Sequence, residues 1–302
     1  MTEITVKAYA KLNLTLDILR RREDGYHDLR MVMQSISLHD TVRLRRTDTG
    51  NISLNSNVPY LPLDRSNLAY RAAEAFFEAV QMENPGLRIS IDKRIPVCAG
   101  MAGGSTDAAA VLRGLRELYC PEMDTAFLCR IGARVGSDVP YCVFSGSALA
   151  EGRGERLTRL APLQECWMVT SKPAFAIPTP ELFAQVDLKR VTRHPDNRGM
   201  LRSIACGDLS GISHRIYNVF EEVLPEKYGA VFDIKNRLLD LGAQSACMTG
   251  SGPTVFGVFS EYGKAEHACA QLLRDYPQTC LSSVINEEPV EAALYDSRCV
   301  NV

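Results

Sequence analysis

The sequence predicts an α+β protein of two domains, and three observations support this prediction. The chain has 302 residues, a length that fits either one large domain or two domains of ordinary size. Residues 4–18 alternate apolar and polar side chains with the period of two that is typical of a strand. Strand-like and helical segments are mixed in both halves of the chain, which favours an α+β architecture.

The composition is that of an ordinary globular protein, with 46% apolar and 23% charged residues. The formal net charge of −2 does not indicate a nucleic-acid partner, and we expect none. The chain contains no run of about 20 apolar residues, so we expect no membrane span. For the assembly we expect a monomer or a weak homodimer.

The ten cysteines are spread along the chain without a CxxC pair, and several lie inside apolar runs. This pattern favours reduced thiols and a cytoplasmic protein over a disulfide framework. The five histidines show neither HExxH nor another close metal-ligand spacing. These residue types therefore give no indication of a metal centre.

The elements expected in the first half are mostly strands at the beginning and helices later. A turn is expected at Asp24-Gly25, where a short glycine-containing segment interrupts the apolar alternation. A helix is expected over 66–81, capped by Ser66 or Asn67. The other strands are expected at 31–38, 41–46, 51–54 and from 87, further helices over 106–119 and 124–136, and mostly extended chain over 136–155.

Glycine and charge concentrate at 151–156, and Pro162 follows, so we place a domain boundary there. The predicted domains are residues 1–161 and 162–302. The elements expected in the second domain are a strand at 166–172, helices within 180–186, 197–206 and 215–241, a strand pair around 246–259, a helix over 263–275 and a last strand near 280–286.

Residues 96–111 read PVCAGMAGGSTDAAAV, a loop of small residues that leads into a helix expected to start at Ser105. Glycine and alanine let a ligand come close to the backbone, and the first N–H groups of a helix attract anions. Phosphate is the usual occupant of such a site, and the hydroxyls of Ser105 and Thr106 could bind phosphate or Mg²⁺. Taken alone, the segment also fits a capped helix after a tight turn. It is neither a Walker A loop nor GxGxxG.

Three further segments carry residues that are unusual for their position. Lys11 and Asn13 lie on one face of an otherwise apolar strand, where burial would be costly without partners. The segment MTGSGPTVFGVF is a second glycine-serine turn, which could also be a plain hairpin turn. Asp138, in GSDVPYC, precedes an apolar stretch read as a strand, and it could also simply end a helix.

Together these segments resemble the GHMP kinase family of ATP-dependent small-molecule kinases. That family combines a lysine on an early strand, a loop of the type P-x-x-x-G-L-G-S-S-A and a late glycine-rich turn, all found here in that order. The resemblance implies a two-domain fold, with a first domain like domain 2 of ribosomal protein S5 and a ferredoxin-like second domain. ATP and substrate would meet between the two domains.

The phrases AKLNLTLDIL, RRREDGYHDL, GSDVPYC and PTPELF narrow the resemblance to members of the non-mevalonate isoprenoid pathway. They imply transfer of the γ-phosphate of ATP, with Mg²⁺, to the 2-hydroxyl of a cytidyl-diphosphate ester of methylerythritol. Alternatives are a homoserine or mevalonate kinase, a decarboxylase of the diphosphomevalonate type and a non-catalytic nucleotide-binding module. The DGYH segment and the position of Phe183 argue against the other kinases. The presence of both Lys11 and Asp138 argues against a non-catalytic nucleotide-binding module.

The resemblance also assigns residues to roles. Asp138 matches the catalytic aspartate, and Lys11 matches the lysine beside it. The positions that match the ATP site are Lys93, Pro96, Ala99, Gly100, Ala102, Gly103, Gly104, Ser105, Thr106 and Asp107. Those on the side of the acceptor substrate are Asn13, Tyr26, His27, Thr179, Phe183, Gly250 and Ser251.

Within the acceptor group, Tyr26 and Phe183 are expected to enclose the cytosine. His27 is expected to recognise the edge of that base, although it could instead be a turn residue next to Gly25. The phosphate loop departs from the family pattern at Cys98 and Ala102, where glycine is common, and at Met101, where leucine is usual. Alanine at position 102 is compatible with the loop if its φ angle is negative.

Overall fold

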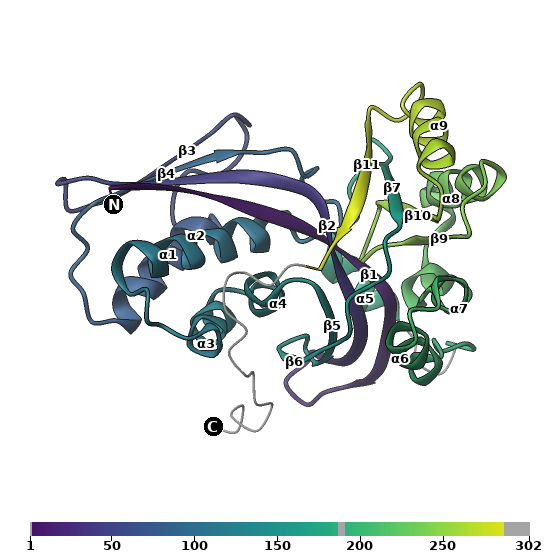
Figure 1. Ribbon diagram of the computed structural model, residues 1–302. Helices are drawn as coiled ribbons and strands as arrows, with labels where there is room; N and C mark the ends of the chain where they lie inside the picture. Colours follow the sequence, from purple (N-terminus) through teal and green to yellow (C-terminus); the bar gives the residue numbers. More distant parts are fainter. Residues whose placement is uncertain (1, 187–190, 287–302) are drawn as a thin grey trace.

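A long antiparallel hairpin runs through the molecule and carries the residues of the first motif (Figure 1). The structure, a computed structural model, describes residues 2–186 and 191–286. The hairpin consists of β1 (Glu3–Arg21) and β2 (His27–Arg46), joined by the predicted turn at Asp24-Gly25. The pairing register shifts between Tyr9 and Lys11 and again after Asn13. Such irregularities bend a strand and re-aim its side chains, here at the two polar residues of the motif.

The first half of the chain adds short strands to this hairpin and covers one face of the sheet with helices (Figure 1). β2 also pairs with β4 and β5, β3 extends the sheet beyond β4, and β6 extends it beyond β5. These strands are β3 (Ile52–Ser56), β4 (Leu87–Asp92), β5 (Ser147–Gly152) and β6 (Arg156–Arg159), and the helices are α1 (Leu68–Ala79), α2 (Gly103–Tyr119), α3 (Thr125–Val135) and α4 (Val139–Phe144).

The second half forms strands that continue the same hydrogen-bonded sheet. β11 joins the two halves, because it pairs with both β2 and β7, and the strand order is β3-β4-β2-β11-β7-β10-β9. The strands are β7 (Trp167–Lys172), β8 (Tyr217–Asn218), β9 (Ser245–Met248), β10 (Val255–Phe259) and β11 (Gln278–Ile285). The helices are α5 (Thr179–Gln185), α6 (Asn197–Ala205), α7 (Leu209–Ser213), α8 (Ala230–Asp240) and α9 (Tyr262–Leu272). The predicted boundary at residue 161 lies between β6 and β7 and stays a prediction.

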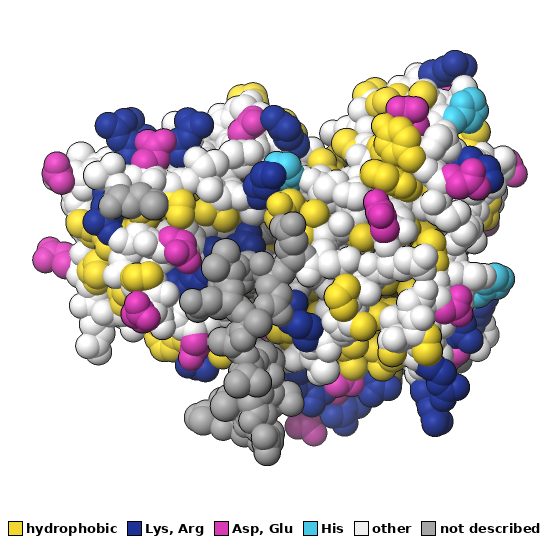
Figure 2. All heavy atoms as spheres, in the orientation of Figure 1, with side chains coloured by type: hydrophobic (Ala, Val, Ile, Leu, Met, Phe, Trp, Pro, Cys, Tyr) yellow, Lys and Arg dark blue, Asp and Glu magenta, His cyan; other side chains and the backbone are white. Residues whose placement is uncertain are grey.

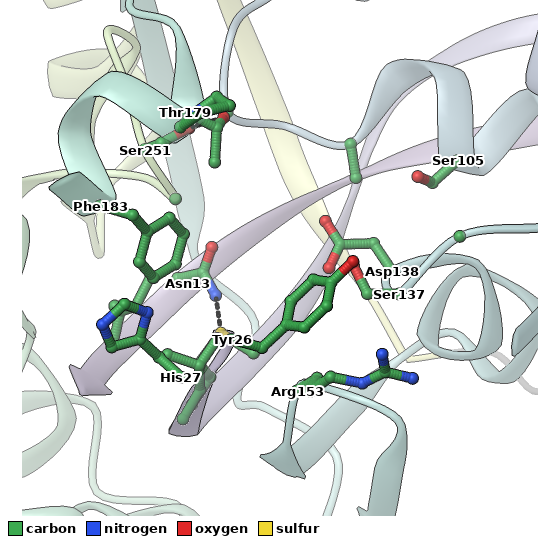
Figure 3. A pocket seen from close by; sticks show the side chains of 18 of the residues that line it. Asn13, Tyr26, His27, Ser105, Ser137, Asp138, Arg153, Thr179, Phe183 and Ser251 are labelled. Carbon is green, nitrogen blue, oxygen red and sulfur yellow. Dashed lines mark hydrogen bonds between the residues drawn. The ribbon is translucent and has the colours of Figure 1, made fainter. Parts of the chain in front are cut away.

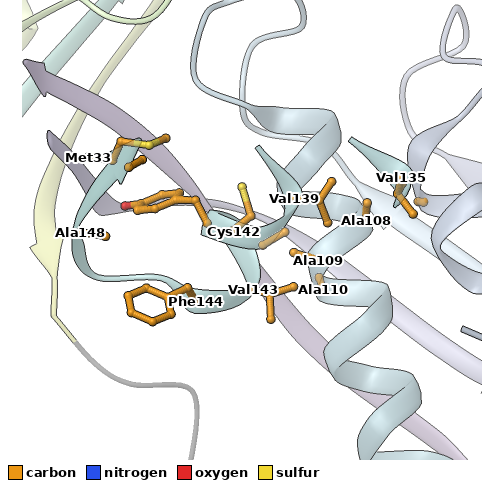
Figure 4. Close-up of a cluster of buried hydrophobic side chains, with 14 of the residues drawn as sticks. Met33, Ala108, Ala109, Ala110, Val135, Val139, Cys142, Val143, Phe144 and Ala148 are labelled. Carbon is orange, nitrogen blue, oxygen red and sulfur yellow. The ribbon is translucent and has the colours of Figure 1, made fainter. Parts of the chain in front are cut away.

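Small residues on α2 bring α4 close to it in the core. Ala108, Ala109 and Ala110 are fully buried, and Val139 and Val143 of α4 pack in the same cluster (Figure 4). A dense interior resists displacement, because separating packed side chains costs dispersion and transfer energy. The packing therefore fixes the start of α4, which directly follows Asp138.

Three sequence-based assignments are wrong, and each has a local reason. Residues 139–144 form α4 and not extended chain, because a short apolar run does not distinguish helix from strand and Pro140 suits a first helical turn. Within 215–241, where helix was expected, only α8 is α-helical; the residues before it form β8 and two 3₁₀ turns, and Pro225 lies between the turns. The helix expected from Ser105 starts at Gly103.

The remaining expectations for the order of strands and helices are confirmed, with several short strands merged into β1 and β2. Asn67 is the N-cap of α1, as one of the two candidates predicted, and its side chain accepts a hydrogen bond from the N–H of Ala69. Figure 2 shows side chains of both charge signs spread over the face in view, in agreement with the small net charge. Among the described residues, no helix has the length and apolar character needed to cross a membrane.

Candidate active site

A large cavity brings together segments that are far apart in the sequence. Its volume is about 1160 Å³, which exceeds what one drug-sized ligand needs. Its walls come from β1, the loop before α2, the end of α3, the turn between β5 and β6, α5 and the turn after β9. The predicted site residues on these walls are Lys11, Asn13, Tyr26, His27, Ala99, Gly100, Ala102, Gly103, Gly104, Ser105, Asp138, Thr179, Phe183, Gly250 and Ser251.

Lys11 and Asn13 are buried on β1 and form a hydrogen bond with each other. The Lys11 ammonium donates to Asn13 Oδ1 at 2.5 Å and to the carbonyl of Gly100 at 2.9 Å. The backbone N–H of Asn13 donates to Thr249 Oγ1 at 3.0 Å. Two polar residues on an apolar strand are thus tolerated because each has partners from other segments.

Burial lowers the pKa of the Lys11 ammonium below its ordinary value, and the nearby Asp138 and Cys142 offset part of this decrease. Among the described residues, the hydrogen-bond acceptors of the ammonium are neutral, namely Asn13 and Gly100. Lys11 is therefore a buried cation without a hydrogen-bonded counter-ion at the wall of the cavity. Such groups are typical of functional sites.

The loop before α2 has an unusual backbone. Gly100 has a φ angle of 74°, and Cys98 and Ala102 also have positive φ angles, of 53° and 59°. The condition under which alanine at position 102 would be compatible with the loop, a negative φ angle, is therefore not met. A non-glycine residue in this region is costly and persists only where its surroundings determine the conformation, as they do here on the wall of the cavity.

The start of α2 offers free N–H groups to the cavity. Its N-cap is Ala102, whose side chain cannot form a capping hydrogen bond, so the first turn has no side-chain cap. Gly103, Gly104 and Ser105 of this turn line the cavity. Thr106 does not, because its hydroxyl donates back to the carbonyl of Gly103 at 2.8 Å. Of the two predicted hydroxyls, the structure thus leaves that of Ser105 at the cavity wall.

The two glycine-rich segments touch each other through their backbones. A Cβ atom on Gly100 would lie 2.3 Å from the carbonyl oxygen of Thr249, and one on Gly250 would lie 2.7 Å from the carbonyl oxygen of Gly100. The same Cβ on Gly250 would lie 3.2 Å from Lys11 Nζ. Glycine is therefore required at both positions by close approach, and the contact lies directly beside the buried ammonium.

Asp138 reaches the cavity from the residue before α4, and its side chain caps no helix (Figure 3). The prediction that it precedes a strand is wrong, but its exposure to the cavity agrees with a chemical role. Thr179 comes from the opposite wall, where its hydroxyl and that of Ser251 form a hydrogen bond of 2.7 Å. α5 is thereby joined to the late glycine turn.

The aromatic side chains of the predicted base site lie together on the cavity wall, and their enclosure of cytosine stays a prediction. Phe183 stacks on His27, with ring centroids 5.0 Å apart and an interplanar angle of 21°, whereas Tyr26 is 58% exposed (Figure 3). Phe220 packs edge-on against Phe183. Burial lowers the pKa of His27, and Arg21 lowers it further, so the imidazole is neutral at neutral pH.

Lys93 lies behind the loop in a buried ion cluster and does not line the cavity. Its ammonium binds the carboxylates of Asp40 and Asp107, the latter at 2.7 Å. Asp40 Oδ1 also accepts hydrogen bonds from the N–H groups of Arg94 and Ile95, at 2.5 and 2.8 Å. The cluster therefore ties β2, the end of β4 and the N-terminal part of α2 together. Pro96 and Asp107 lie off the cavity wall as well.

Comparison with known proteins decides the family. Models of the N-terminal and C-terminal domains of GHMP kinases match residues 67–146 and 201–278. A 4-diphosphocytidyl-2-C-methyl-D-erythritol kinase of Clostridium tetani is 45% identical over 93% of this chain and 99% of its own length. The chain belongs to the GHMP kinases.

Further relatives place this GHMP kinase more narrowly. A kinase of the same name from Listeria monocytogenes is 44% identical over 87% of this chain and 89% of its own length. A crystal structure of 4-(cytidine 5'-diphospho)-2C-methyl-D-erythritol kinase superposes with a TM-score of 0.78 at 32% identity, covering 93% of this chain and 99% of the other. A homoserine kinase from Cytophaga hutchinsonii shares the fold, with a TM-score of 0.73 at 16% identity, covering 95% and 96% of the two chains.

Sequence reasoning missed several charged residues of this GHMP kinase site. Arg153 lines the cavity with its guanidinium carbon 5.1 Å from the centre of the Tyr26 ring, and Arg21 and Arg134 line it too. Asp40 of the buried cluster was also missed. The available signal was the glycine-rich, charged segment at 151–156, which resembles a domain boundary in sequence although it forms a turn at the cavity.

The ion cluster predicts how stability depends on pH. Burial raises the pKa of Asp107 to about 8, and Asp40 adds to this increase while Lys93 opposes it. Because the pKa is raised, folding is favoured by the proton on Asp107, and this stabilisation is lost as the pH rises through the window from about 4 to about 8. Asp107→Asn carries no such proton. The free energy of unfolding of the variant minus that of the native enzyme should therefore increase as the pH rises through this window.

Urea denaturation at several pH values within the window measures this difference. Asp48→Asn, which removes a carboxylate at an exposed position, is the control and should not reproduce the increase expected of Asp107→Asn. A difference for Asp107→Asn that does not change with pH would contradict the assignment.

Proposed function

We propose that this GHMP kinase transfers the γ-phosphate of ATP to the 2-hydroxyl of 4-diphosphocytidyl-2-C-methyl-D-erythritol. The observation that carries the proposal is the agreement between the relatives and one cavity. Relatives 39–45% identical over about 93% of this chain bear the name of that kinase. The cavity holds an anion-binding helix start, a buried lysine and an accessible aspartate side by side.

The loop and the first turn of α2 provide the site for the ATP phosphates. The free N–H groups of Gly103, Gly104 and Ser105 and the positive end of the helix attract negative charge. Lys93 and Asp107 contribute from behind by holding α2 just after its first turn, as their hydrogen bond indicates. Their role in ATP binding is therefore to position the loop, and direct contact with ATP is left to the loop itself.

Asp138 and Lys11 are the residues proposed to act on the reacting atoms. Asp138 would accept the proton of the 2-hydroxyl as its oxygen attacks the γ-phosphorus, while the bond from that phosphorus to the β,γ-bridging oxygen breaks and ADP leaves. Lys11 would stabilise the charge on the transferred group, since its ammonium is fixed by Asn13 and Gly100 before substrate binds. Such a fixed cation requires little reorganisation during the reaction.

Mg²⁺ fits this site as an ion that enters with ATP. In residues 2–186 and 191–286, no group of three or more His, Cys, Asp or Glu side chains could hold a metal ion. Mg²⁺ is commonly held by substrate phosphates with one or two protein oxygens, and the oxygens of Ser105 and Asp138 are at the cavity wall. When bound, the ion would neutralise part of the phosphate charge.

The aromatic wall is the proposed site of the cytosine. The centroids of His27 and Phe183 lie 5.0 Å apart, which leaves no room for a base between them. We therefore expect the His27 ring to turn away when substrate binds, so that the base stacks on Phe183 and Tyr26 closes over it. The neutral imidazole of His27 could then exchange a hydrogen bond with the edge of the base.

The fold by itself does not select this reaction. Mevalonate pyrophosphate decarboxylase from Streptococcus pyogenes shares it with a TM-score of 0.69 at 13% identity. One assay separates the candidates: native enzyme is incubated with ATP and the cytidyl substrate, mevalonate, homoserine or diphosphomevalonate in turn. Phosphorus NMR should show a new phosphomonoester and ADP only with the cytidyl substrate, without release of CO₂. Turnover of another acceptor alone would contradict the proposal.

Asp138→Asn should lower kcat by about 10² to 10⁴, the usual range for loss of a general base, with little change in KM. Lys11→Ala should lower kcat as well, and the double variant should be less impaired than the product of both effects, because the two groups act together. Steady-state kinetics measure this, with Lys7→Ala on the exposed face of β1 as the control. Near-native kcat in Asp138→Asn would exclude Asp138 as the base.

Gly104→Val should weaken ATP binding by at least about tenfold, or 1.4 kcal/mol, without unfolding the protein. Among the described residues outside its own helix turn, a Cβ atom on Gly104 would meet Leu68 at 3.6 Å, an ordinary contact, and Gly104 lines the cavity at the proposed phosphate site. Gly263→Val, at the second residue of α9, is the matched control, because Gly104 is the second residue of α2. Calorimetry measures the affinity of both variants for ATP. Equal affinities of the two variants would argue against a phosphate site at the start of α2.

His27→Ala should reduce the preference of the enzyme for the cytidyl substrate over its uridyl analogue, whereas Tyr26→Ala should weaken both alike. Stacking does not distinguish the two bases, but a hydrogen bond to the base edge does, because a mismatch leaves buried polar groups unpaired. The ratio of kcat/KM for the two analogues is the measurement, with unchanged ATP binding as the control. If the ratio is the same in native and His27→Ala enzyme, His27 has no role in base recognition.

A further inference from the structure

Asn218 is a buried polar residue that belongs to no wall of the cavity. It ends the short strand β8, which runs parallel to β1 with Asn218 opposite Leu16, and it is fully buried. Its amide nitrogen donates to the carbonyls of Met248 and Gly250, both at 2.8 Å, and its amide oxygen accepts from the N–H of Phe220 at 3.0 Å. One side chain thus binds both ends of the segment 248–250.

This segment leads into a glycine-rich turn. Gly250 has a φ angle of 57°, and Gly252, two residues later, has one of 75°, so the turn contains two residues with wide conformational freedom. The N–H of Gly252 donates to the carbonyl of Thr249, and the N–H of Thr249 donates to the carbonyl of Thr254, both at 2.9 Å. Further anchors are the N–H of Asn13, bound by Thr249, and Glu221, which accepts from the N–H of Met248 at 2.7 Å. Asn218 alone among these holds the carbonyl of Gly250.

The position of Gly250 matters because its backbone lies against the reactive lysine. A Cβ atom there would be 2.7 Å from the carbonyl oxygen of Gly100 and 3.2 Å from Lys11 Nζ. That carbonyl is one of the two acceptors that fix the Lys11 ammonium. A displacement of Gly250 would therefore move the acceptor and the ammonium with it.

We propose that Asn218 is a positioning residue for phosphoryl transfer, which holds the late glycine turn against the phosphate loop and so fixes the Lys11 ammonium. This inference rests on the proposed function, because Lys11 acts there on the transferred phosphate. It also explains why a residue of the second half, outside every predicted motif, is buried with all three of its hydrogen bonds directed at backbone groups. Removing the amide would leave two buried carbonyls without donors.

The test compares Asn218→Ala and Asn218→Ser with Asn197→Ala. Asn197 is also buried and is also bound to β1, through the hydroxyl of Thr15 at 2.6 Å, but it does not contact the turn. Asn218→Ala should lower kcat by about 10- to 100-fold, the cost of small misplacements in an active site, with a smaller change in either KM. Asn218→Ser, which keeps one donor, should lose less, and Asn197→Ala should stay within about threefold of native kcat at a comparable melting temperature.

A double-mutant cycle with Gly250→Ala separates positioning from general destabilisation. If Asn218 acts through the turn, Asn218→Ala should have little further effect on kcat in the Gly250→Ala background. Fully independent effects, or near-native kcat in folded Asn218→Ala, would overturn the proposal. If Asn218→Ala does not fold, the same cycle with Asn218→Ser decides.

A readout without turnover keeps the inference separate from the proposed function. The backbone amide signal of Gly250 in ¹⁵N-labelled protein should shift in Asn218→Ala and Asn218→Ser but not in Asn197→Ala. An inactive native enzyme would contradict the proposed function only. An unchanged Gly250 signal in both Asn218 variants would contradict the inference whatever the activity.

Discussion

The backbone of the loop before α2 touches the backbone of the turn after β9, and the rest of the site depends on this contact. A single added carbon on Gly100 would lie 2.3 Å from the carbonyl of Thr249. No side chain fits between the two segments, so their backbones approach closely. The carbonyl of Gly100 therefore binds the Lys11 ammonium, and Gly250 lies against both groups. The contact joins a loop of the first half of the chain to a turn of the second, so the continuous sheet through β2, β11 and β7 has to hold both.

Two buried lysines on either side of this loop have pKa values that are shifted in opposite directions. Burial alone would lower the pKa of Lys93, but Asp107 and Asp40 raise it above its ordinary value, so this lysine is a permanent cation that holds structure. Burial lowers the pKa of Lys11, whose hydrogen-bond acceptors in the described chain are neutral. A buried ion cluster such as that of Lys93 with Asp40 and Asp107 serves rigidity, whereas a cation without a bound counter-ion retains capacity to stabilise charge that arrives with a substrate. Lys93 thus supports the loop, whereas Lys11 is available to interact with a substrate.

Much of this arrangement was predictable from the sequence, and the exceptions have physical causes. The period-two pattern predicts β1, and the small-residue loop predicts a helix start, which the structure places at the cavity as α2, because both are local properties; the anion site there stays a prediction. Whether Lys93 faces ATP or carboxylates depends on Asp40, which lies 53 residues away, so no local pattern contains that information. The stacking of His27 on Phe183 and the anchoring role of Asn218 likewise depend on contacts between distant segments. The positive φ angle of Ala102 is imposed by the surrounding packing against the preference of alanine itself.

The central claim is that Lys11 is a buried ammonium held ready beside Asp138 before substrates bind. The most direct measurement is an NMR titration of the lysine side-chain signals in ¹³C-labelled native protein, with Lys11 identified by its absence in Lys11→Arg. The account predicts that the Lys11 signal titrates below the ordinary pKa of a lysine side chain, because burial lowers its pKa. A Lys11 signal that titrates at or above the ordinary lysine value in the native protein would contradict the account.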